Sequence, residues 1–271
     1  MDFKGVFVST KDFSKLTGFL KKMGEICLIT LKDHHIKMVA YTAGTTSTSV
    51  WVKVDPEAIF ARYLLQGTIS LLVQARDLHQ MVYAVSQSKS TTVELIHHNI
   101  EQPFLRFTSE SDHAEEIGEL DVDLVSEHQV RHIKEPGTDI PDVCLTLPPI
   151  NSLVNFVTAH SRTIETISLC ANRTGYLQLS VKSPSVAAEL VTNGLTIPPL
   201  SVRIPDLEDP TTEFTVHVKS KQIKKFLNCK MLNLTDVFFS IKDRVQLNFF
   251  VFFNLGNGAN SVLTVHVPIF I

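Results

Sequence analysis

Apolar residues recur along the chain in short runs, and most of these runs have the two-residue period of β-strands. Valine, isoleucine, threonine and phenylalanine are frequent in them, as in "FKGVFVS" near the start and "SVLTVHV" near the end. Turn signals such as "NRTG", "IKDR" and "LGNGAN" separate neighbouring runs. The pattern predicts antiparallel hairpins and not the βαβ crossovers of a parallel sheet.

Four stretches have a different period, with apolar residues at steps of three and four, which predicts amphipathic helices. Leu16 and Leu20 show this spacing in the first stretch, and Ile223 and Phe226 show it in the last. The predicted helices span residues 11–23, 75–88, 149–163 and 219–232.

The order of strands and helices predicts two similar halves, each with two helices among antiparallel strands. We expect a first domain at residues 1–125 and a second at residues 142–271. Residues 126–141 lie between them and contain Pro136, Gly137 and Pro141, which favours an extended connector. The sequence therefore predicts an α+β protein built from a structural repeat.

The composition is that of a globular protein with enough apolar residues for a buried core. Of the 271 residues, 44% are hydrophobic, and no apolar run approaches the roughly 18 residues of a membrane span. No secretory signal is evident, and the four cysteines form no CxxC pair. Reduced core thiols are therefore favoured over disulfides, in a cytosolic or nuclear protein.

Positive charge is concentrated on the predicted helices, although the formal net charge of the chain is −3. With Lys89 just past the second helix, the helices hold 12 of the 25 lysines and arginines but only two acids, Asp12 and Asp77. The basic residues are Lys11, Lys15, Lys21, Lys22, Arg76, Lys89, Arg162, Lys219, Lys221, Lys224, Lys225 and Lys230. A solvated helix usually mixes the two signs, so this bias needs a different explanation.

Helical geometry places many of these cations on one outward face of each helix, at about 100° per residue. Lys11, Lys15 and Lys22 fall together on the first helix, and Lys221, Lys224 and Lys225 on the fourth. Arg76 and Arg162 occupy the corresponding faces of the other two helices. If all four helices pack on the same side of the sheets, that side is positive and the outer side is negative.

Such a face could simply be solvated, but its recurrence favours contact with a polyanion. Lysines without interleaved aromatic residues suit phosphate backbones better than bases or single strands. We therefore expect binding to duplex DNA that is independent of sequence and weakened by salt.

Sequence signatures of catalysis are absent from the chain. It has no glycine-rich phosphate loop, no HExxH and no GxSxG, and its paired histidines have no partners at ligand spacing. Acidic clusters at residues 110–123 and 205–210 leave a metal-dependent nuclease open as an alternative, with Asp121 and Asp123 as candidate ligands. We predict no enzyme, no metal and no cofactor.

Several segments resemble the DNA sliding clamps related to proliferating cell nuclear antigen. They include "MDFKGVF" at the start, "SVWVKVDPEAIFARYLLQG" at 49–67 and "NRTGYLQLSV" at 172–181. "ELIHHNIEQPFLRFTSE" at 94–110 and "EPGTDIPDVCLTLPPINSLVNFV" at 135–157 are similar, within that family, to Hus-type subunits of the nine-one-one checkpoint clamp. The likeness spans essentially the whole chain.

The resemblance implies a sliding-clamp fold, with helices lining a hole and sheets outside, in one subunit of a pseudo-sixfold heterotrimeric ring around duplex DNA. It implies a nuclear, non-enzymatic platform in DNA-damage signalling and repair. The implied partners are two related clamp subunits, an ATP-dependent clamp loader, and repair and checkpoint proteins, with no membrane.

By position in that family, the subunit-interface strands would lie at about residues 114–125 and 186–192. The residues expected there are Ala114, Ile117, Leu120, Val122, Val125, Val186, Ala188 and Leu190. Three alternatives remain open: a homotrimeric replicative clamp, the nuclease named above, and an unrelated α+β interaction module.

Overall fold

The fold was analysed in a computed structural model, which describes residues 2–42, 48–97, 101–110, 114–137, 139–161, 163–198, 209–256 and 258–270. The first half contains two long helices, α1 (Thr10–Met23) and α3 (Ala75–Ala84), and the short helix α2 (Pro56–Ile59). Its strands are β1 (Phe3–Phe7), β2 (Ile26–Lys32), β3 (His35–Tyr41), β4 (Ser49–Val54), β5 (Phe60–Leu65), β6 (Ile69–Gln74), β7 (Ser90–Ile96), β8 (Phe104–Glu110), β9 (Glu115–Asp121) and β10 (Asp123–Leu124).

The second half, after the connecting helix α4 (Glu127–His132), has a similar order of elements; among its described residues it has no counterpart of α2 and one strand fewer between its two long helices. Its helices are α5 (Ile150–His160) and α6 (Ser220–Phe226). Its strands are β11 (Val143–Thr146), β12 (Thr166–Ala171), β13 (Leu177–Lys182), β14 (Ala187–Thr192), β15 (Phe214–Lys219), β16 (Asn233–Lys242), β17 (Gln246–Leu255) and β18 (Ala259–Val267). Short 3-10 turns extend α3 through Gln87 and α6 through Met231.

A nine-stranded antiparallel sheet runs through both halves. Its order is β10-β6-β2-β3-β4-β18-β17-β16-β11, so β4 of the first half pairs with β18 of the second. Trp51 lies opposite Thr264 at this junction. A five-stranded sheet, β5-β1-β7-β8-β9, closes one end of the molecule, and a four-stranded sheet, β14-β13-β12-β15, closes the other. The halves are therefore joined by main-chain hydrogen bonds as well as by the connector.

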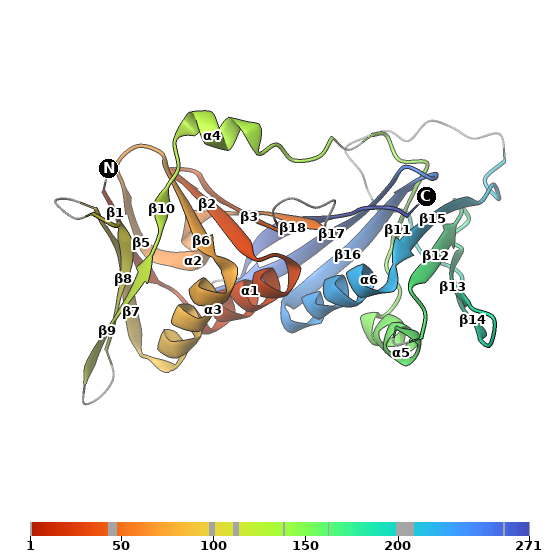
Figure 1. Ribbon diagram of the computed structural model, residues 1–271, viewed down its shortest axis with the longest axis horizontal. Helices are drawn as coiled ribbons and strands as arrows, with labels where there is room; N and C mark the ends of the chain where they lie inside the picture. Colours follow the sequence, from red (N-terminus) through yellow and green to blue (C-terminus); the bar gives the residue numbers. More distant parts are fainter. Residues whose placement is uncertain are drawn as a thin grey trace.

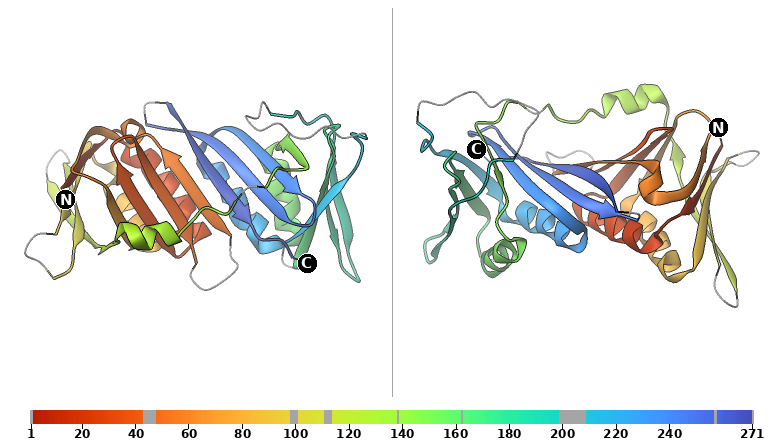
Figure 2. Two further views of the ribbon diagram at one scale, coloured as in Figure 1. Left: turned by 90° about the horizontal axis from the view of Figure 1, so that it is seen from above. Right: turned by 180° about the vertical axis from the view of Figure 1, so that it is seen from behind.

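The helices α3, α1, α6 and α5 follow one another along a single side of the central sheet (Figures 1 and 2). Their apolar stripes face the sheet, and Leu16, Leu20, Val82, Val157 and Phe226 are almost completely buried. The four predicted helices are thus confirmed, with the last shorter than expected and finished by a 3-10 turn. We call this side of the molecule the helix face.

Local signals in the sequence explain where α1 begins and ends. Ser9 Oγ accepts a hydrogen bond from the Asp12 backbone N–H at 3.2 Å, which caps the first turn. Gly24 ends the helix beside β3, where an added Cβ would collide with the Tyr41 backbone. The chain can therefore turn directly from α1 into β2 only with a glycine at this position.

An ion pair fastens the start of the second half to the hairpin between β16 and β17. Asp142 accepts hydrogen bonds from Lys242 Nζ and the Asp243 backbone N–H, both at 2.8 Å. Burial alone would raise the pKa of this carboxyl, but these bonds and the nearby charges of Lys242 and Arg173 outweigh it and lower the pKa. The carboxylate form is thus stabilised in the folded protein.

The sequence predicted an extended connector. The structure instead shows that the first part of the connector forms the helix α4. Ser126 caps this helix in a capping box with Gln129, and Val130 and Ile133 pack on Leu28, Val39 and Trp51. Figure 1 shows α4 on the side of the central sheet opposite the other helices. We call that side the outer face. No helix in the described ranges is long and apolar enough to cross a membrane.

Candidate nucleic-acid interface

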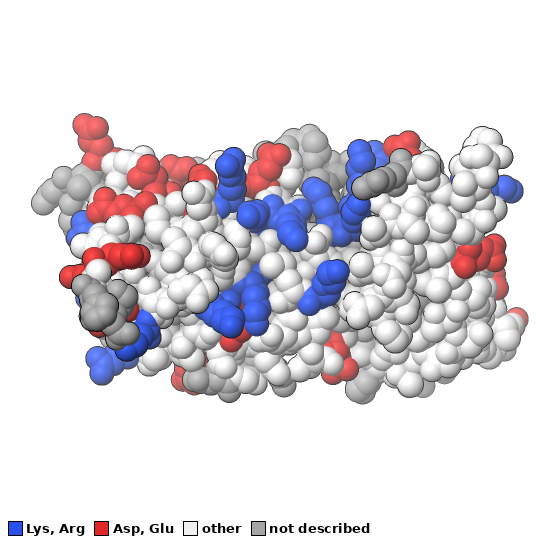
Figure 3. Space-filling view, turned by 90° about the horizontal axis from the view of Figure 1, so that it is seen from below, with Lys and Arg blue, Asp and Glu red and all other residues white. Residues whose placement is uncertain are grey.

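Lysines of the two halves meet where α1 lies beside α6. Figure 3 shows Lys and Arg side chains gathered across the middle of the helix face. The exposed lysines of these two helices and of the turn after α6 are Lys11, Lys21, Lys22, Lys221, Lys224, Lys225 and Lys230. We call this group the lysine seam. It joins residues that lie about 200 positions apart in the sequence.

Asn228 links the two sides of the lysine seam. Its Oδ1 accepts a hydrogen bond from Lys22 Nζ at 2.8 Å. Its Nδ2 donates to the carbonyl oxygens of Lys224 at 3.0 Å and Lys225 at 2.9 Å, at the end of α6. One amide thus satisfies carbonyls at the helix C-terminus and positions a lysine of the other half.

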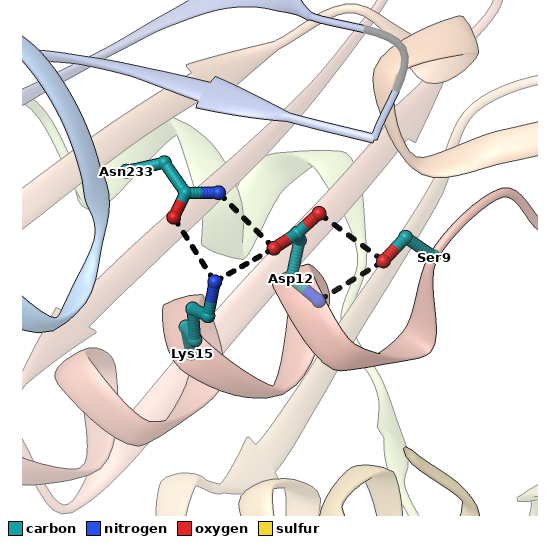
Figure 4. Close-up of polar contacts among 4 residues, drawn as sticks. All are labelled: Ser9, Asp12, Lys15 and Asn233. Atoms are coloured by element: carbon teal, nitrogen blue, oxygen red, sulfur yellow. Dashed lines mark hydrogen bonds and ion pairs between the residues drawn. The ribbon is translucent and has the colours of Figure 1, made fainter. Parts of the chain in front are cut away.

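A second contact between the halves surrounds Asp12, as Figure 4 shows. Asp12 Oδ1 lies 2.9 Å from Lys15 Nζ and 3.1 Å from Asn233 Nδ2, and Asn233 Oδ1 accepts from Lys15 Nζ at 3.0 Å. The Ser9 hydroxyl donates to Asp12 Oδ2 at 3.2 Å. Lys15 is therefore paired within the protein, unlike most of the exposed lysines of the seam.

Electrostatics around Asp12 favour its charged form. Burial is the largest influence and raises the pKa of this carboxyl. Hydrogen bonds from Lys15, Asn233 and Ser9, together with the charge of Lys15, outweigh burial and lower the pKa below its usual value. The site therefore holds an anion within a positive face.

Two lysines of the lysine seam lower the pKa of His79 on the neighbouring helix α3. Thr17 Oγ1 and His79 Nδ1 are 3.2 Å apart. Burial, and then the charges of Lys21 and Lys22, lower the pKa of this imidazole, although a hydrogen bond with the Ser14 backbone raises it in part. The neutral form of His79 is thus favoured, and the charge of the face comes from lysine.

Beyond the lysine seam, the structure describes Arg76 but not Arg162 among the predicted DNA-facing cations. Arg76 is exposed in the first turn of α3. Lys224 Nζ lies 3.3 Å from Ser161 Oγ and so links α6 to the end of α5. Arg162 is outside the described residues. The structure therefore brings together the cations of α1 and α6, while Arg76 stands apart from them.

The strand β9 forms a free edge of the five-stranded sheet. Ala114 and Ile117, both predicted at an interface, are exposed there, and the Ile117 side chain is 62% exposed. Leu120 and Val122 are buried in the core instead, and Val125 packs against the α4 cluster. These three side chains therefore pack within the subunit, and the role of this strand at an interface stays a prediction.

The strand β14 forms a free edge of the four-stranded sheet, at the opposite end of the molecule (Figure 1). Val186, Ala188 and Leu190 were predicted at an interface, but they are half-buried and pack against the core. Because side chains alternate along a strand, Glu189 and Val191 point the other way and are exposed. The sequence located the edge strand, and its role at an interface stays a prediction.

The outer face carries positive charge near the hairpin between β2 and β3. Lys32, Lys37 and Lys53 lie there with His35, on the same side of the sheet as α4. The expected negative outer side is therefore wrong in this region. Alternating inward and outward residues along three neighbouring strands produce the patch, which the helix-based count could not detect.

Clusters suited to metal binding do not occur in the part of the chain that the structure describes. No group of three His, Cys, Asp or Glu side chains there could hold a metal ion. Asp121 and Asp123 are exposed at the ends of β9 and β10. Residues 205–208 of the second acidic cluster are outside the described ranges. The four cysteines are unpaired thiols, of which Cys27, Cys144 and Cys229 are buried.

Comparisons with known proteins agree with this architecture. Residues 1–270 match the family described as Hus1-like protein. The checkpoint protein hus1 of Schizosaccharomyces pombe is 29% identical over 211 residues, which cover 74% of this chain and 72% of that protein. A crystal structure of the proliferating cellular nuclear antigen of Entamoeba histolytica covers 99% of both chains with a TM-score of 0.77 at 13% identity. The predicted fold class is confirmed: the chain belongs to the Hus1-like family and has the fold of a sliding clamp.

Proposed function

We propose that the chain is a non-enzymatic subunit of a heterotrimeric checkpoint clamp that encircles duplex DNA. The observation that carries this proposal is the lysine seam, which gathers the cations of both halves on the helix face. A ring of such subunits places the helix faces around the hole and the sheets outside. Its tasks are DNA-damage signalling and repair in the nucleus.

The chemistry of the lysine seam suits phosphates and not bases. Lysine is a flexible point charge, and the aromatic residues of α1 and α6, Phe13, Phe19 and Phe226, are buried and offer no surface on which a base could stack. Contacts of this kind hold a duplex without fixing its register, so the ring can slide. Lys15 contributes less than its neighbours because Asp12 and Asn233 already pair it.

The two edge strands support association with related but different subunits. Each edge offers unpaired main-chain groups, which a strand of a neighbouring subunit can satisfy. On β9, Glu115, Glu119 and Asp121 share one face, because each lies opposite an outward residue of β8. The only charged residue of β14 is Glu189. If β9 of one copy of this chain paired with β14 of another, the acids of β9 would lie near Glu189, and their repulsion disfavours a homotrimer.

Charge reversal in α6 tests the role of the lysine seam. The triple change Lys221→Glu, Lys224→Glu and Lys225→Glu should impair retention on circular duplex DNA but leave subunit assembly intact. The log–log salt dependence should become flatter by about 0.9 for each phosphate that the variant no longer binds. The control reverses Lys32, Lys53 and Lys182, which are also exposed but lie away from the helix face. Unchanged DNA retention by the α6 variant at low salt would refute the assignment.

Light scattering tests the stoichiometry. The chain has a mass of 30.3 kDa, so a homotrimer would have three times that mass, about 91 kDa. We expect a monomer alone and a complex with one copy each of two related clamp subunits after mixing. A stable homotrimer would instead indicate a replicative clamp. Loading by an ATP-dependent clamp loader, and recruitment of repair and checkpoint proteins to the loaded ring, complete the proposal.

A further inference from the structure

Helix α3 presents different side chains on the helix face from those of α1 and α6. Leu78 and Val82 of α3 are buried, so the opposite side of the helix points away from the sheet. Exposed residues at steps of four and three occupy that side, namely Arg76, Gln80 and Tyr83. We call these three residues the α3 stripe. It combines a cation, an amide and an aromatic ring, where the lysine seam has lysines.

The aromatic ring of the α3 stripe is open to solvent. Tyr83 is 65% exposed, and among the described residues of α1, α3, α5 and α6 it is the only large hydrophobic residue with such exposure. A single exposed tyrosine is common on protein surfaces, so its surroundings decide what it does.

A histidine of the same helix restrains the ring of Tyr83. The ring centres of His79 and Tyr83 are 5.9 Å apart, and the rings are tilted by 45°. His79 Nδ1 lies 3.2 Å from Thr17 Oγ1 on α1, which runs beside α3 (Figure 1). Gly18 packs so closely that an added Cβ would lie 3.0 Å from His79 Cε1. Because α1 holds His79 in place, the Tyr83 ring is oriented before any ligand arrives, which lowers the entropic cost of binding.

Positive charge lies close to this pair of rings. Burial, and then the charges of Lys21 and Lys22, lower the pKa of His79, so both lysines lie near the ring that supports Tyr83. The acid of α3, Asp77, is in the first turn of the helix and to one side of the α3 stripe. An exposed aromatic ring beside cations is the combination with which proteins bind single-stranded nucleic acid.

An intact duplex offers the ring of Tyr83 nothing to stack on, because its bases already stack on one another. Unpaired bases in a gap, or where a single strand meets a duplex, have free faces for an aromatic ring. Their edges are also free, and the Gln80 amide can both donate and accept hydrogen bonds there. The α3 stripe therefore suits an unpaired strand better than paired DNA.

We propose that Tyr83 stacks on an unpaired base of gapped DNA within the ring, while Arg76 binds a phosphate of the same strand. This inference rests on the proposed function, because it takes the helix face to lie against DNA. Seven residues separate Arg76 from Tyr83, which is about 10 Å along the helix axis. A few nucleotides of one strand cover that distance. The ring thus slides along paired DNA on the lysine seam and pauses where a strand is unpaired.

Fluorescence anisotropy with the full chain tests Tyr83 without the other subunits. The probes are a fluorescein-labelled oligothymidylate and a labelled duplex of equal length, both at low salt. The variants are Tyr83→Ala, which removes the ring, and Tyr83→Phe, which keeps it. The control is Leu64→Ala, because Leu64 is 66% exposed and lies on β5, away from the helix face. Thermal unfolding verifies that each variant is folded.

We expect Tyr83→Ala to weaken binding of the oligothymidylate about fivefold or more and to leave binding of the duplex unchanged. Tyr83→Phe and Leu64→Ala should bind like the native chain, because stacking needs the ring and not the hydroxyl. A second readout uses the ring assembled with two related clamp subunits on a gapped circular duplex. The base 2-aminopurine, placed in the gap, should lose fluorescence when the native ring is loaded, because stacking quenches it, and should keep its fluorescence with Tyr83→Ala.

Four outcomes would overturn the inference: no binding of the oligothymidylate by the native chain, native-like binding by Tyr83→Ala, an equal loss of duplex binding, or a failure of Tyr83→Phe to bind. Loss of assembly in Tyr83→Ala would also overturn it and identify Tyr83 as a contact with another subunit. If the native ring does not retain circular DNA although Tyr83→Ala behaves as expected on the oligothymidylate, the proposed function fails and the stacking role stands. If the ring is retained but 2-aminopurine fluorescence does not change, the inference alone fails.

Discussion

Removing the Asp12 carboxylate should lower the stability of the protein and raise its affinity for DNA. Asp12 accepts hydrogen bonds from Lys15 and Asn233, and Asn233 belongs to the other half of the chain. It is also the acid in the first turn of α1, next to the Ser9 cap. Asp12→Ala therefore deletes a contact between the halves and an anion of the helix face together.

The decrease in stability can be estimated from the interactions that Asp12 makes. A carboxylate at a helix N-terminus contributes about 0.3–1 kcal/mol, and the pair with Lys15 about 0.2–0.5 kcal/mol. The hydrogen bond with Asn233 contributes about 0.5–1.5 kcal/mol. Together these interactions predict that Asp12→Ala lowers the free energy of unfolding by roughly 1–3 kcal/mol. Each kcal/mol lost should lower the Tm by about 2–4 °C.

The gain in DNA affinity has a different origin. Without Asp12, Lys15 loses its ion pair and becomes available to a phosphate, and one repulsive charge leaves the helix face. If Lys15 binds one additional phosphate, the log–log salt dependence becomes steeper by about 0.9. We therefore expect tighter binding at low salt and little difference at high salt.

The experiment combines urea unfolding of the subunit with DNA retention by the assembled ring across a salt series. Asp77→Ala is the matched control, because Asp77 is the first-turn acid of α3 and has no hydrogen bond or ion pair among the described residues. Asp77→Ala should lower the free energy of unfolding by no more than about 1 kcal/mol and leave the salt dependence of DNA retention nearly unchanged. If Asp12→Ala leaves the salt dependence as it was, or weakens DNA retention in an intact ring, the assigned role of Asp12 is wrong.

Three further predictions concern the core and the titratable groups. Phe226→Ala should cost about 3–5 kcal/mol in urea unfolding, because Phe226 is fully buried and stacks on Phe249 at 3.8 Å between ring centres. The folded-state pKa of Asp142 is lowered from 3.8, so its stabilising effect is present above that pH and is lost as the pH falls through the folded-state pKa. Unfolding midpoints measured from pH 5 downward should therefore fall less in Asp142→Asn than in the native chain. Burial raises the pKa of the Cys27 thiol to about 12. Iodoacetamide should therefore modify the half-buried Cys170 first in the native protein, and mass spectrometry can determine the order of modification. Modification of Cys27 first would contradict this prediction.

The sequence predicted the long helices well because their apolar spacing follows their buried faces. Leu16 and Leu20 lie on the sheet as their period indicates. Helix α4 was missed, although "SEHQ" carries the capping-box pattern that the structure shows at Ser126 and Gln129. The prolines that follow suggested an extended connector, and a helix of one and a half turns has too few residues for periodicity to identify it.

The candidate site was predicted only in part, because its residues lie far apart in the sequence. Helical spacing could place cations on one face of each helix, but it could not show which helices lie side by side. Asn228 and Asn233 fix the contact between the halves, and neither has a sequence signal for that role. The positive patch on the outer face was missed because Lys37 and Lys53 meet only through strand pairing.

The junction between β4 and β18 has a consequence for synthesis of the protein. Lys53 pairs opposite Val262, so 209 residues separate the partners in the chain. At about 5–20 residues per second, roughly 10–40 s pass on the ribosome between the two strands. Throughout that time β4 is an unpaired edge of the kind on which nascent chains aggregate. Chaperones that shield strand edges should therefore engage the emerging first half, and release it once β18 has left the exit tunnel.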